Sequence, residues 1–340
     1  MRFGEIPVDD ASGAIAGHSL RAGGISLRKG NPISAEMASA LKAAGVETVV
    51  AARLDPDDVG EDEAALTLAE AAAGPGVRVE TPFTGRSNLF AAAAGILLAQ
   101  RSEIDAVNAV DEAVTIATLP AYKPVVEGEM IATVKIIPYA VSRPTLVRAL
   151  SEMGEGPAIS IAPYGLKRVG VISTTTPALK PTVIAKTVSA LRARLDPASA
   201  SIVAEATCSH APEPLTRELI LQAEADLEVI VVFGASAIAD RRDVIPAAIE
   251  AAGGHVEHFG MPVDPGNLLL LGSLGGKPVI GAPGCARSPK ENGFDWILQR
   301  LLAGLPVARA DITRLGVGGL LMEIVSRGQP REGGEPGEEG

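Results

Sequence analysis

The chain has 340 residues, enough for two domains of ordinary size, and a formal net charge of −11. That charge argues against a nonspecific nucleic-acid binder, because such proteins carry basic surface. Two cysteines, Cys208 and Cys285, are too few for a disulfide-stapled extracellular domain and favour a reducing compartment.

The sequence also predicts that the protein has no membrane partner. The first residues, MRFGEIPVDDASG, lack a basic segment followed by an apolar core, so we expect no signal peptide. The longest apolar-looking run, residues 88–99, is far shorter than the ~20 residues that a membrane span needs. We therefore expect a soluble, cytoplasmic protein.

The first half of the chain, residues 1–160, is expected to form a mixed α+β domain whose role the sequence does not reveal. β-Branched runs favour strands there, and alanine-rich runs favour helices. The expected elements are a helix from about Ser34 to Ala44, a strand at 47–53, helices within 64–74 and 87–100, and one long strand at 129–141.

The second half, residues 166–327, alternates apolar runs with amphipathic segments, which is the rhythm of a doubly wound α/β fold with a mostly parallel sheet and helices on both faces. Such sheets bind ligands at the carboxyl ends of their strands. The acidic tail, residues 328–340, is expected to be disordered because it cannot bury a core. The expected strands are 168–175, 201–206, 227–234, 255–263, 268–272 and 278–284, and the expected helices are 183–195, 214–225 and 243–254.

The first candidate cluster follows the strand at 227–234. A glycine and small residues leave the strand end, so a ligand can approach the backbone, and the N–H groups at the start of the next helix suit an anionic oxygen. Asp243 either caps that helix or positions a metal or a ligand hydroxyl, and the sequence leaves both readings open. The residues of the cluster are Gly234, Ala235, Ser236, Ala237, Arg242 and Asp243.

The second candidate cluster is a turn formed by Asp264, Pro265, Gly266 and Asn267. A residue before proline is expected to be extended, so the Asp264 carboxylate would be presented on the turn. An ordinary Asx-Pro-Gly turn without chemistry explains the same residues, and the pattern alone favours that reading.

The third candidate cluster lies between the last predicted strand and a segment with the apolar spacing of a helix. Its glycine-containing turn and its cationic side chains have the composition of an anion site. Its residues are Pro283, Gly284, Arg287, Ser288 and Lys290.

Cys285 lies in the same segment and requires separate treatment. A catalytic thiol has a nearby histidine or an electropositive setting. None of the four histidines stands in a cysteine-enzyme motif, and the Cys-x5-Arg loop of phosphatases is absent because residue 291 is Glu. The sequence therefore favours a structural cysteine over a reactive one.

Together the clusters resemble the molybdopterin-binding domain shared by molybdopterin molybdenumtransferases and molybdopterin adenylyltransferases. The resemblance covers roughly residues 168–305, and its strength lies in the order and spacing of short motifs. These motifs are Gly234-Ala235-Ser236-Ala237, Arg242-Asp243-Val244, Asp264-Pro265-Gly266-Asn267-Leu268, Gly275-Gly276-Lys277-Pro278-Val279 and Gly281-Ala282-Pro283-Gly284-Cys285-Ala286.

The resemblance implies that molybdopterin, or its nucleotide form, is the ligand or substrate. The two glycine-containing loops, with Arg287, Ser288 and Lys290, would hold its phosphate or pterin, and Asp243 and Asp264 would coordinate Mg²⁺ or orient a reacting group. It further implies a homo-oligomer, with other molybdenum-cofactor enzymes as partners. One departure from the family is the stretch Ser173-Thr174-Thr175-Thr176-Pro177, which replaces an acidic motif and leaves no carboxylate there.

The sequence thus leads to a hypothesis and two alternatives. The hypothesis is a protein of molybdenum-cofactor biosynthesis or handling, with a transferase activity of the molybdenumtransferase or adenylyltransferase type left open. The first alternative is a Mg²⁺-dependent nucleotide-handling enzyme on the same fold. The second alternative is a non-catalytic carrier or chaperone that delivers the cofactor, which the lost acidic motif favours.

Overall fold

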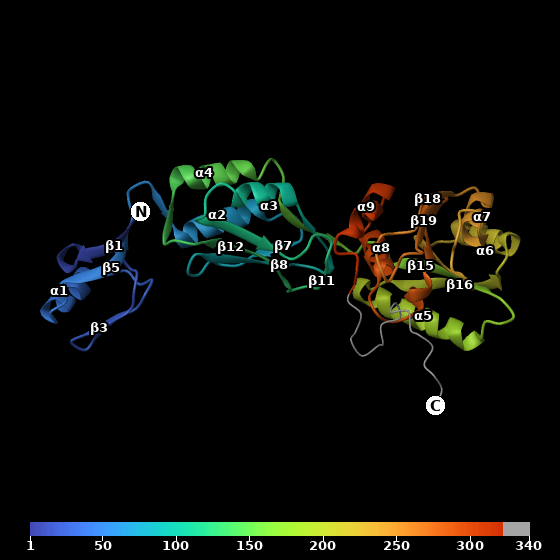
Figure 1. Ribbon diagram of the computed structural model, residues 1–340, viewed down its shortest axis with the longest axis horizontal. Coiled ribbons are helices and arrows are strands. Elements are labelled where there is room, and N and C mark those ends of the chain that lie inside the picture. The colour runs from blue at the N-terminus through green and yellow to red at the C-terminus, as the bar shows by residue number, and fades with distance from the viewer. Residues whose placement is uncertain (322–340) are drawn as a thin grey trace, which may run out of the picture. The chain divides into compact units, whose positions relative to one another are not determined.

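The computed structural model describes residues 1–321, so the tail at 328–340 that was expected to be disordered lies outside the described residues. The chain divides into two compact units, Met1–Pro163 and Tyr164–Gly340 (Figure 1). Both units combine helices with sheets, so the fold class is α/β. Within residues 1–321, every helix is too short or too polar to cross a lipid bilayer.

The first part of unit 1 is a small antiparallel sheet with one helix. The sheet has the order β1-β5-β2, and a separate hairpin joins β3 to β4. Ser34 caps the helix by accepting a hydrogen bond from the N–H of Met37, and Leu41 is fully buried in the core that the helix covers. The elements are β1 (Arg2–Pro7), η1 (Val8–Asp10), β2 (Ile15–Ala16), β3 (Leu20–Ala22), β4 (Ile25–Leu27), α1 (Ala35–Ala43) and β5 (Thr48–Arg53).

The rest of unit 1 is a layer of helices over antiparallel strands (Figure 1). Its main sheet has the order β10-β12-β8-β7, and two smaller sheets have the orders β11-β9-β14 and β13-β6. The elements are β6 (Asp58–Gly60), α2 (Glu61–Ala72), β7 (Val77–Val79), β8 (Arg86–Ala91), β9 (Gly95–Ala99), α3 (Arg101–Asn108), β10 (Val114–Thr118), β11 (Pro124–Val125), β12 (Met130–Ile136), β13 (Ala140–Ser142), α4 (Arg143–Glu152) and β14 (Ile159–Pro163).

The helix expected within residues 87–100 is wrong, because this segment forms the strands β8 and β9. Ser87, Leu89 and Ala91 are buried in alternation, which is the period of a strand, and the alanines had obscured that period. A side chain at Gly95 would collide with the carbonyl group of Ala162, so this glycine permits β9 and β14 to pair closely.

The prediction of a single long strand at 129–141 is also wrong. β12 ends at Ile136, a bend at residues 137–139 follows, and β13 begins at Ala140. Pro138 lies in the bend and has no N–H to donate to a neighbouring strand, which gives a physical reason for the break.

Unit 2 is built on a six-stranded mixed sheet with the order β16-β15-β17-β20-β19-β18. The first four of these strands run parallel, and β19 and β18 join antiparallel. The elements are β15 (Arg168–Thr175), α5 (Pro181–Leu195), η2 (Asp196–Ala198), β16 (Ser201–Ser209), α6 (Pro212–Glu224), β17 (Val229–Phe233), α7 (Val244–Ala251), β18 (His255–Phe259), β19 (Leu270–Leu274), β20 (Lys277–Ala282), η3 (Gly284–Arg287), α8 (Gly293–Leu302), α9 (Arg309–Thr313) and η4 (Arg314–Gly316).

Side chains from both faces of this sheet are buried under helices. Ile230 and Val232 of β17 belong to a core cluster that includes residues of α6 and α7. Phe233 points the other way, and its ring centroid lies 6.2 Å from that of Phe294 in α8. Burial on both faces explains why β17 is apolar at every position.

Candidate functional site at the carboxyl edge of the sheet in unit 2

Four neighbouring parallel strands of unit 2 end at one edge of the sheet, and a polar or glycine-rich segment follows each end. Thr174 lies at the end of β15 and is paired in register with Cys208 of β16. His210 follows β16, Gly234 follows β17, and Arg287 ends the short η3 helix after β20. We call these four strand ends and the loops that leave them the carboxyl edge.

Thr174 connects two of the loops at the carboxyl edge. Its Oγ accepts a hydrogen bond from the N–H of Ala235 at 2.8 Å and lies 2.8 Å from Nδ1 of His210. The side chain is buried, so this hydroxyl satisfies a backbone donor that would otherwise have no partner at the start of the loop. The 234–237 loop is thus held by a side chain from β15.

Arg287 joins the first and third candidate clusters. Its Nη2 donates a hydrogen bond to the carbonyl oxygen of Gly234, and its Nη1 lies 3.3 Å from the hydroxyl of Thr187 in α5. The side chain is half-buried, and this desolvation lowers the pKa of the guanidinium from its ordinary value. Arginine remains charged in proteins, so Arg287 keeps a positive charge next to the 234–237 loop.

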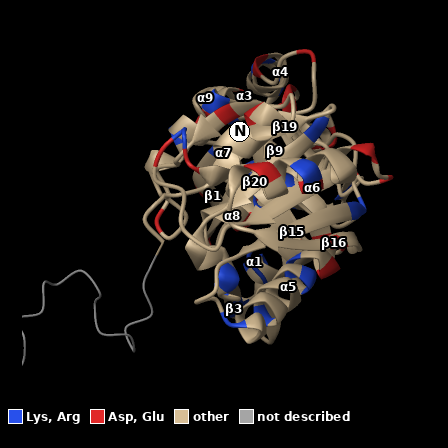
Figure 2. Cartoon of the chain, turned by 90° about the vertical axis from the view of Figure 1, so that its right-hand side faces the viewer, with Lys and Arg blue, Asp and Glu red and all other residues tan. Residues whose placement is uncertain are grey.

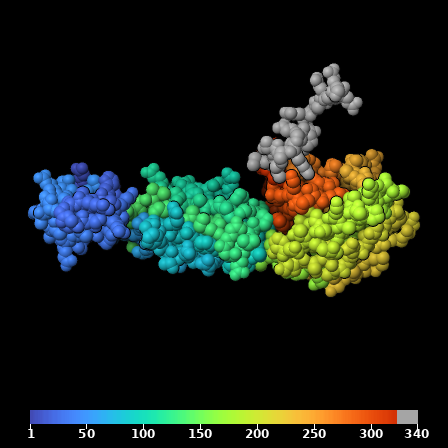
Figure 3. Space-filling view, turned by 90° about the horizontal axis from the view of Figure 1, so that it is seen from below, coloured from blue at the N-terminus to red at the C-terminus, as the bar shows by residue number. Residues whose placement is uncertain are grey.

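Arg194 of α5 holds the third cluster in place, although no sequence pattern singled it out. Its Nη1 donates to the carbonyl of Ala286 at 3.0 Å, and its Nη2 donates to the carbonyl of Ser288 at 2.6 Å and to that of Lys290 at 3.2 Å. Residues of α5 and the elements after β20, far apart in sequence, lie side by side in the space-filling view (Figure 3).

The second candidate cluster, residues 264–267, packs against the segment that follows the third. The N–H of Gly293, at the start of α8, donates to the carbonyl of Pro265 at 2.9 Å. Gly266 has a φ of +140°, and a side chain there would lie 2.8 Å from the nitrogen of Gly293. The backbone of Asp264 is also bonded to Gly319 and Leu321. The turn is therefore connected to the third cluster through the start of α8.

Asp243 is the N-cap of α7. One carboxylate oxygen accepts from the N–H of Val244 at 2.7 Å, and the other accepts from the N–H of Ala239 at 3.0 Å. The neighbouring Arg242 is largely exposed and pairs with Asp240 at 2.8 Å. One oxygen of Asp243 therefore caps α7, and the other holds the loop that precedes the helix.

Several donors near the carboxyl edge have no acceptor within residues 1–321. The N–H groups of Ser236, Ala237 and Ile238 have no hydrogen-bond partner there, and neither does Nζ of the exposed Lys290. The side-chain oxygen of Ser288 accepts only a long bond, 3.4 Å, from the N–H of Lys290. Groups of free N–H donors next to a guanidinium suit a ligand that carries anionic oxygens.

The residues predicted to hold magnesium do not form a metal site by themselves. In the described part of the chain, His, Cys, Asp and Glu side chains do not gather in any group of three or more that could hold a metal ion. Both oxygens of Asp243 are committed to backbone donors. Mg²⁺ in proteins is commonly held by one or two carboxylates together with substrate phosphates and waters, so magnesium at Asp243 and Asp264 stays a prediction.

Cys285 lies in η3 and is half-buried. Burial raises the pKa of its thiol above the ordinary value. The carboxylate of Asp295 raises it further, whereas the positive charge of Arg194 lowers it. A raised pKa disfavours the nucleophilic thiolate. A structural role for Cys285 stays the prediction made from the sequence.

Two residues at the carboxyl edge, Thr174 and His210, were not predicted as site residues. Thr174 belongs to the stretch that replaces an acidic motif of the family, and no other feature of the sequence indicated a role for it. His210 directly follows β16, which extends beyond the strand predicted at 201–206, and its place near that predicted strand end was a signal that could have identified it. Arg194 gave no such signal, because its partners in the third cluster and in α8 are 92 to 101 residues away.

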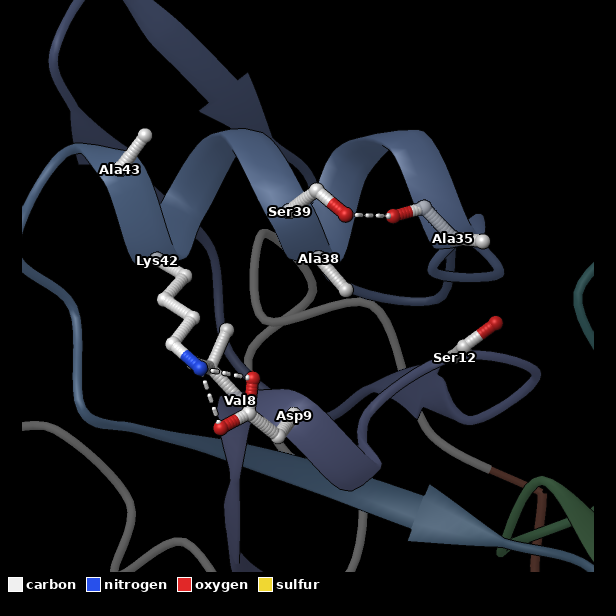
Figure 4. A pocket seen from close by; sticks show the side chains of 8 residues that line it. All are labelled: Val8, Asp9, Ser12, Ala35, Ala38, Ser39, Lys42 and Ala43. Carbon is white, nitrogen blue, oxygen red and sulfur yellow. Dashed lines mark hydrogen bonds and ion pairs between the residues drawn. The ribbon is translucent and has the colours of Figure 1, made fainter.

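A shallow pocket in unit 1 shows no comparable set of free donors. It lies beside α1, where Lys42 pairs with both oxygens of Asp9 at 2.7 Å and the hydroxyl of Ser39 donates to the carbonyl of Ala35 at 2.9 Å (Figure 4). In the cartoon of Figure 2, Lys and Arg positions are interspersed with Asp and Glu positions along the chain.

Comparison with known proteins gives limited information. The model of a domain of unknown function, DUF8806, matches residues 5–53. No curated protein matches the chain. Among solved structures, the molybdopterin biosynthesis MoeA protein from Pyrococcus horikosii aligns with 89% of this chain and 75% of its own, at 15% identity and a TM-score of 0.30. Similarity this low supports no argument about function.

Proposed function

We propose that unit 2 binds molybdopterin, or its nucleotide form, at the carboxyl edge, and that the protein acts in the biosynthesis or handling of the molybdenum cofactor. The observation that carries the proposal is the bond from Arg287 to the carbonyl of Gly234, which joins the first and third clusters. These are two of the segments whose order resembles the molybdopterin-binding domain. We also propose that unit 2 is a doubly wound domain.

The ligand would be held mainly through its phosphate. The free N–H groups of residues 236–238 and the guanidinium of Arg287 are donors, and the exposed Lys290 adds a second positive charge. A doubly or singly charged phosphate accepts several such bonds at once. Ser236, Ala237, Pro283, Gly284 and Ser288 would line the ligand, and the turn at Asp264, Pro265, Gly266 and Asn267 would bound it near α8.

The side chains of this chain favour binding or delivery of the cofactor over a metal-dependent transfer reaction. The carboxylate of Asp243 caps α7, and the stretch after β15 supplies threonines in place of acidic side chains. We therefore propose that the chain binds the cofactor and hands it on to another protein.

The direct test is to titrate the purified full-length chain with molybdopterin under anaerobic conditions and to measure the bound pterin after rapid gel filtration. The wild-type chain should retain the pterin at micromolar protein concentration. Arg287→Ala should weaken retention at least about ten-fold, because a bond between a charged donor and a charged acceptor is lost. Arg217→Ala is the control, since Arg217 is exposed on α6 and, among residues 1–321, pairs only with Glu213.

Absence of pterin binding by the wild-type chain would sink the proposal. A nucleotide-handling enzyme is the second candidate, since the same donors suit any phosphate ester. Release of phosphate or pyrophosphate from ATP and Mg²⁺ in the absence of pterin would favour that enzyme. Transfer of bound pterin to an apo-molybdoenzyme at unchanged rate in an Asp243→Asn, Asp264→Asn double variant would favour a carrier.

A further inference from the structure

His210 occupies a position at the carboxyl edge that none of the three clusters includes. Its backbone is fixed, because its N–H donates to the carbonyl of Thr175 at 2.8 Å. Its side chain turns toward the loop after β17, with Nδ1 at 2.8 Å from Oγ of Thr174. Its Cε1 would lie 3.7 Å from a Cβ built on Gly234. The imidazole therefore lies against the start of the 234–237 loop.

The contact with Thr174 occupies Nδ1 of His210 and leaves Nε2 as the ring nitrogen open to a ligand. Oγ of Thr174 accepts the N–H of Ala235 at 2.8 Å, so its own proton is available for one acceptor. Nδ1 of His210 lies at 2.8 Å, whereas the carbonyl of Phe233 lies at 3.5 Å. When Thr174 donates this proton to Nδ1, Nδ1 is an acceptor and a neutral imidazole carries its proton at Nε2; when Thr174 donates it to Phe233, Nδ1 donates to Oγ instead. A phosphate oxygen at Nε2 selects the first arrangement, because it needs a donor there.

Nε2 of His210 has no hydrogen-bond partner within the described residues, where the contact with Thr174 is the only hydrogen bond of the ring. The ring is half-buried, so a ligand acceptor at this place would bind it with little competition from water. The other groups nearby that have no partner in residues 1–321 are donors as well, namely the N–H groups of residues 236–238. The guanidinium of Arg287, which already donates to Gly234, adds a positive charge beside them. A ligand must supply acceptors to all of them.

We propose that His210 is a ligand-binding residue of the carboxyl edge, whose Nε2–H donates a hydrogen bond to an anionic phosphate oxygen. Thr174 is the positioning residue, because it orients the ring through Nδ1 and at the same time fixes the N–H of Ala235. This inference rests on the proposed function in that both concern the same phosphate. It extends the site to the β16 strand end, where sequence motifs assign no role.

Two substitutions separate the roles of the two ring nitrogens. The amide of asparagine reaches about as far as Nδ1, so His210→Asn keeps a partner for Thr174 but removes the donor at Nε2. The amide of glutamine reaches about as far as Nε2, so His210→Gln keeps the donor but gives up the bond to Thr174. A purely structural histidine would need the contact between Nδ1 and Thr174. A ligand-binding histidine would need the donor at Nε2.

The experiment measures the dissociation constants of molybdopterin and of inorganic phosphate for the full chain and both variants, together with their urea unfolding midpoints. His210→Asn should weaken both ligands about ten-fold or more at an unchanged unfolding midpoint, the loss expected for a bond to a charged acceptor. His210→Gln should bind within about three-fold of wild type, since it retains the donor.

Wild-type affinity in His210→Asn would overturn the inference, and so would weakened molybdopterin binding with phosphate binding intact. Equal losses of affinity and stability in both variants would assign His210 a structural role and overturn it as well. A wild-type chain that binds phosphate through His210 but not molybdopterin would reject the proposed function and keep the inference. A wild-type chain that binds neither ligand would overturn both.

Discussion

Arg194 of α5 and Asp295 of α8 form an ion pair with a Nε–Oδ1 distance of 2.6 Å, and their side chains are only 8% and 10% exposed. Asp295 also completes the capping box of α8 by accepting the N–H of Asn292 at 2.8 Å. The guanidinium lies over the ring of Phe294, 5.7 Å from its centroid. One buried arginine thus ties together α5, the 285–290 loop and α8.

Truncating Arg194 should destabilise unit 2 strongly. Arg194→Ala leaves the Asp295 carboxylate buried without its partner, and breaking a buried pair in this way costs about 3–5 kcal/mol. Urea unfolding followed by circular dichroism measures the loss. The matched control is Arg192→Ala on the same helix, whose side chain is 58% exposed and pairs with Glu205 at 3.0 Å. That variant should lose less than about 1 kcal/mol, and equal losses in the two variants would contradict the role given to Arg194.

The contrast between Arg194 and the strands of unit 2 shows what sequence could predict. The strands at β15, β16 and β17 were predictable because apolar runs report local periodicity. The capping of α7 by Asp243 was predictable as one of two readings, because a cap depends on residues next to it in sequence. The contacts of Arg194 and of Thr174 were not, because they join residues 36 to 101 positions apart and leave no local pattern.

The same reasoning explains the error at residues 87–100. Alanine favours helices in isolation, but tertiary pairing overrides this preference when a strand finds partners on both sides. β8 pairs with β12 and with β7, and the sequence carries no record of those partners. Distant pairing therefore limits the prediction of unit 1 more than that of unit 2.

Gly234→Ala should disturb the carboxyl edge. A Cβ at this position would lie 2.5 Å from the carbonyl oxygen of Ser236 and 3.0 Å from Cδ1 of Ile245, so the loop must shift. We expect a loss of about 1–3 kcal/mol in unfolding free energy, as for other overpacked sites. Gly284→Ala is the stability control, because no atom lies within 4 Å of a Cβ there. An unchanged unfolding midpoint for Gly234→Ala would show that the loop adapts freely.

Both thiols of the folded chain should react slowly with iodoacetamide. Burial raises the pKa of Cys285, and burial followed by the charge of Glu218 raises that of Cys208. Less thiolate is present at a given pH, so the alkylation rates should fall below those of the urea-unfolded chain, and the pH midpoints of alkylation should be higher than in that chain. Cys208→Ser and Cys285→Ser report each thiol separately, and fast alkylation of Cys285 in the folded chain would restore the reactive-cysteine reading.

Tyr164 should make the chain less stable at high pH. Burial raises the pKa of Tyr164 to about 12, so between about pH 10 and 12 the folded state keeps a proton that the unfolded state releases. The contribution of Tyr164 to the free energy of unfolding is therefore fully present below pH ~10 and is lost as the pH rises toward 12. Tyr164→Phe cannot ionise and serves as the reference, since both chains share every other titration.

Urea unfolding of both chains should give free energies within about 0.5 kcal/mol of each other near pH 9, where neither residue is charged. Near pH 12, wild type should have fallen below Tyr164→Phe by up to about 2 kcal/mol, because its folded state must then bury a phenolate or unfold. A constant difference across this range would mean that the hydroxyl of Tyr164 is solvated in the folded chain.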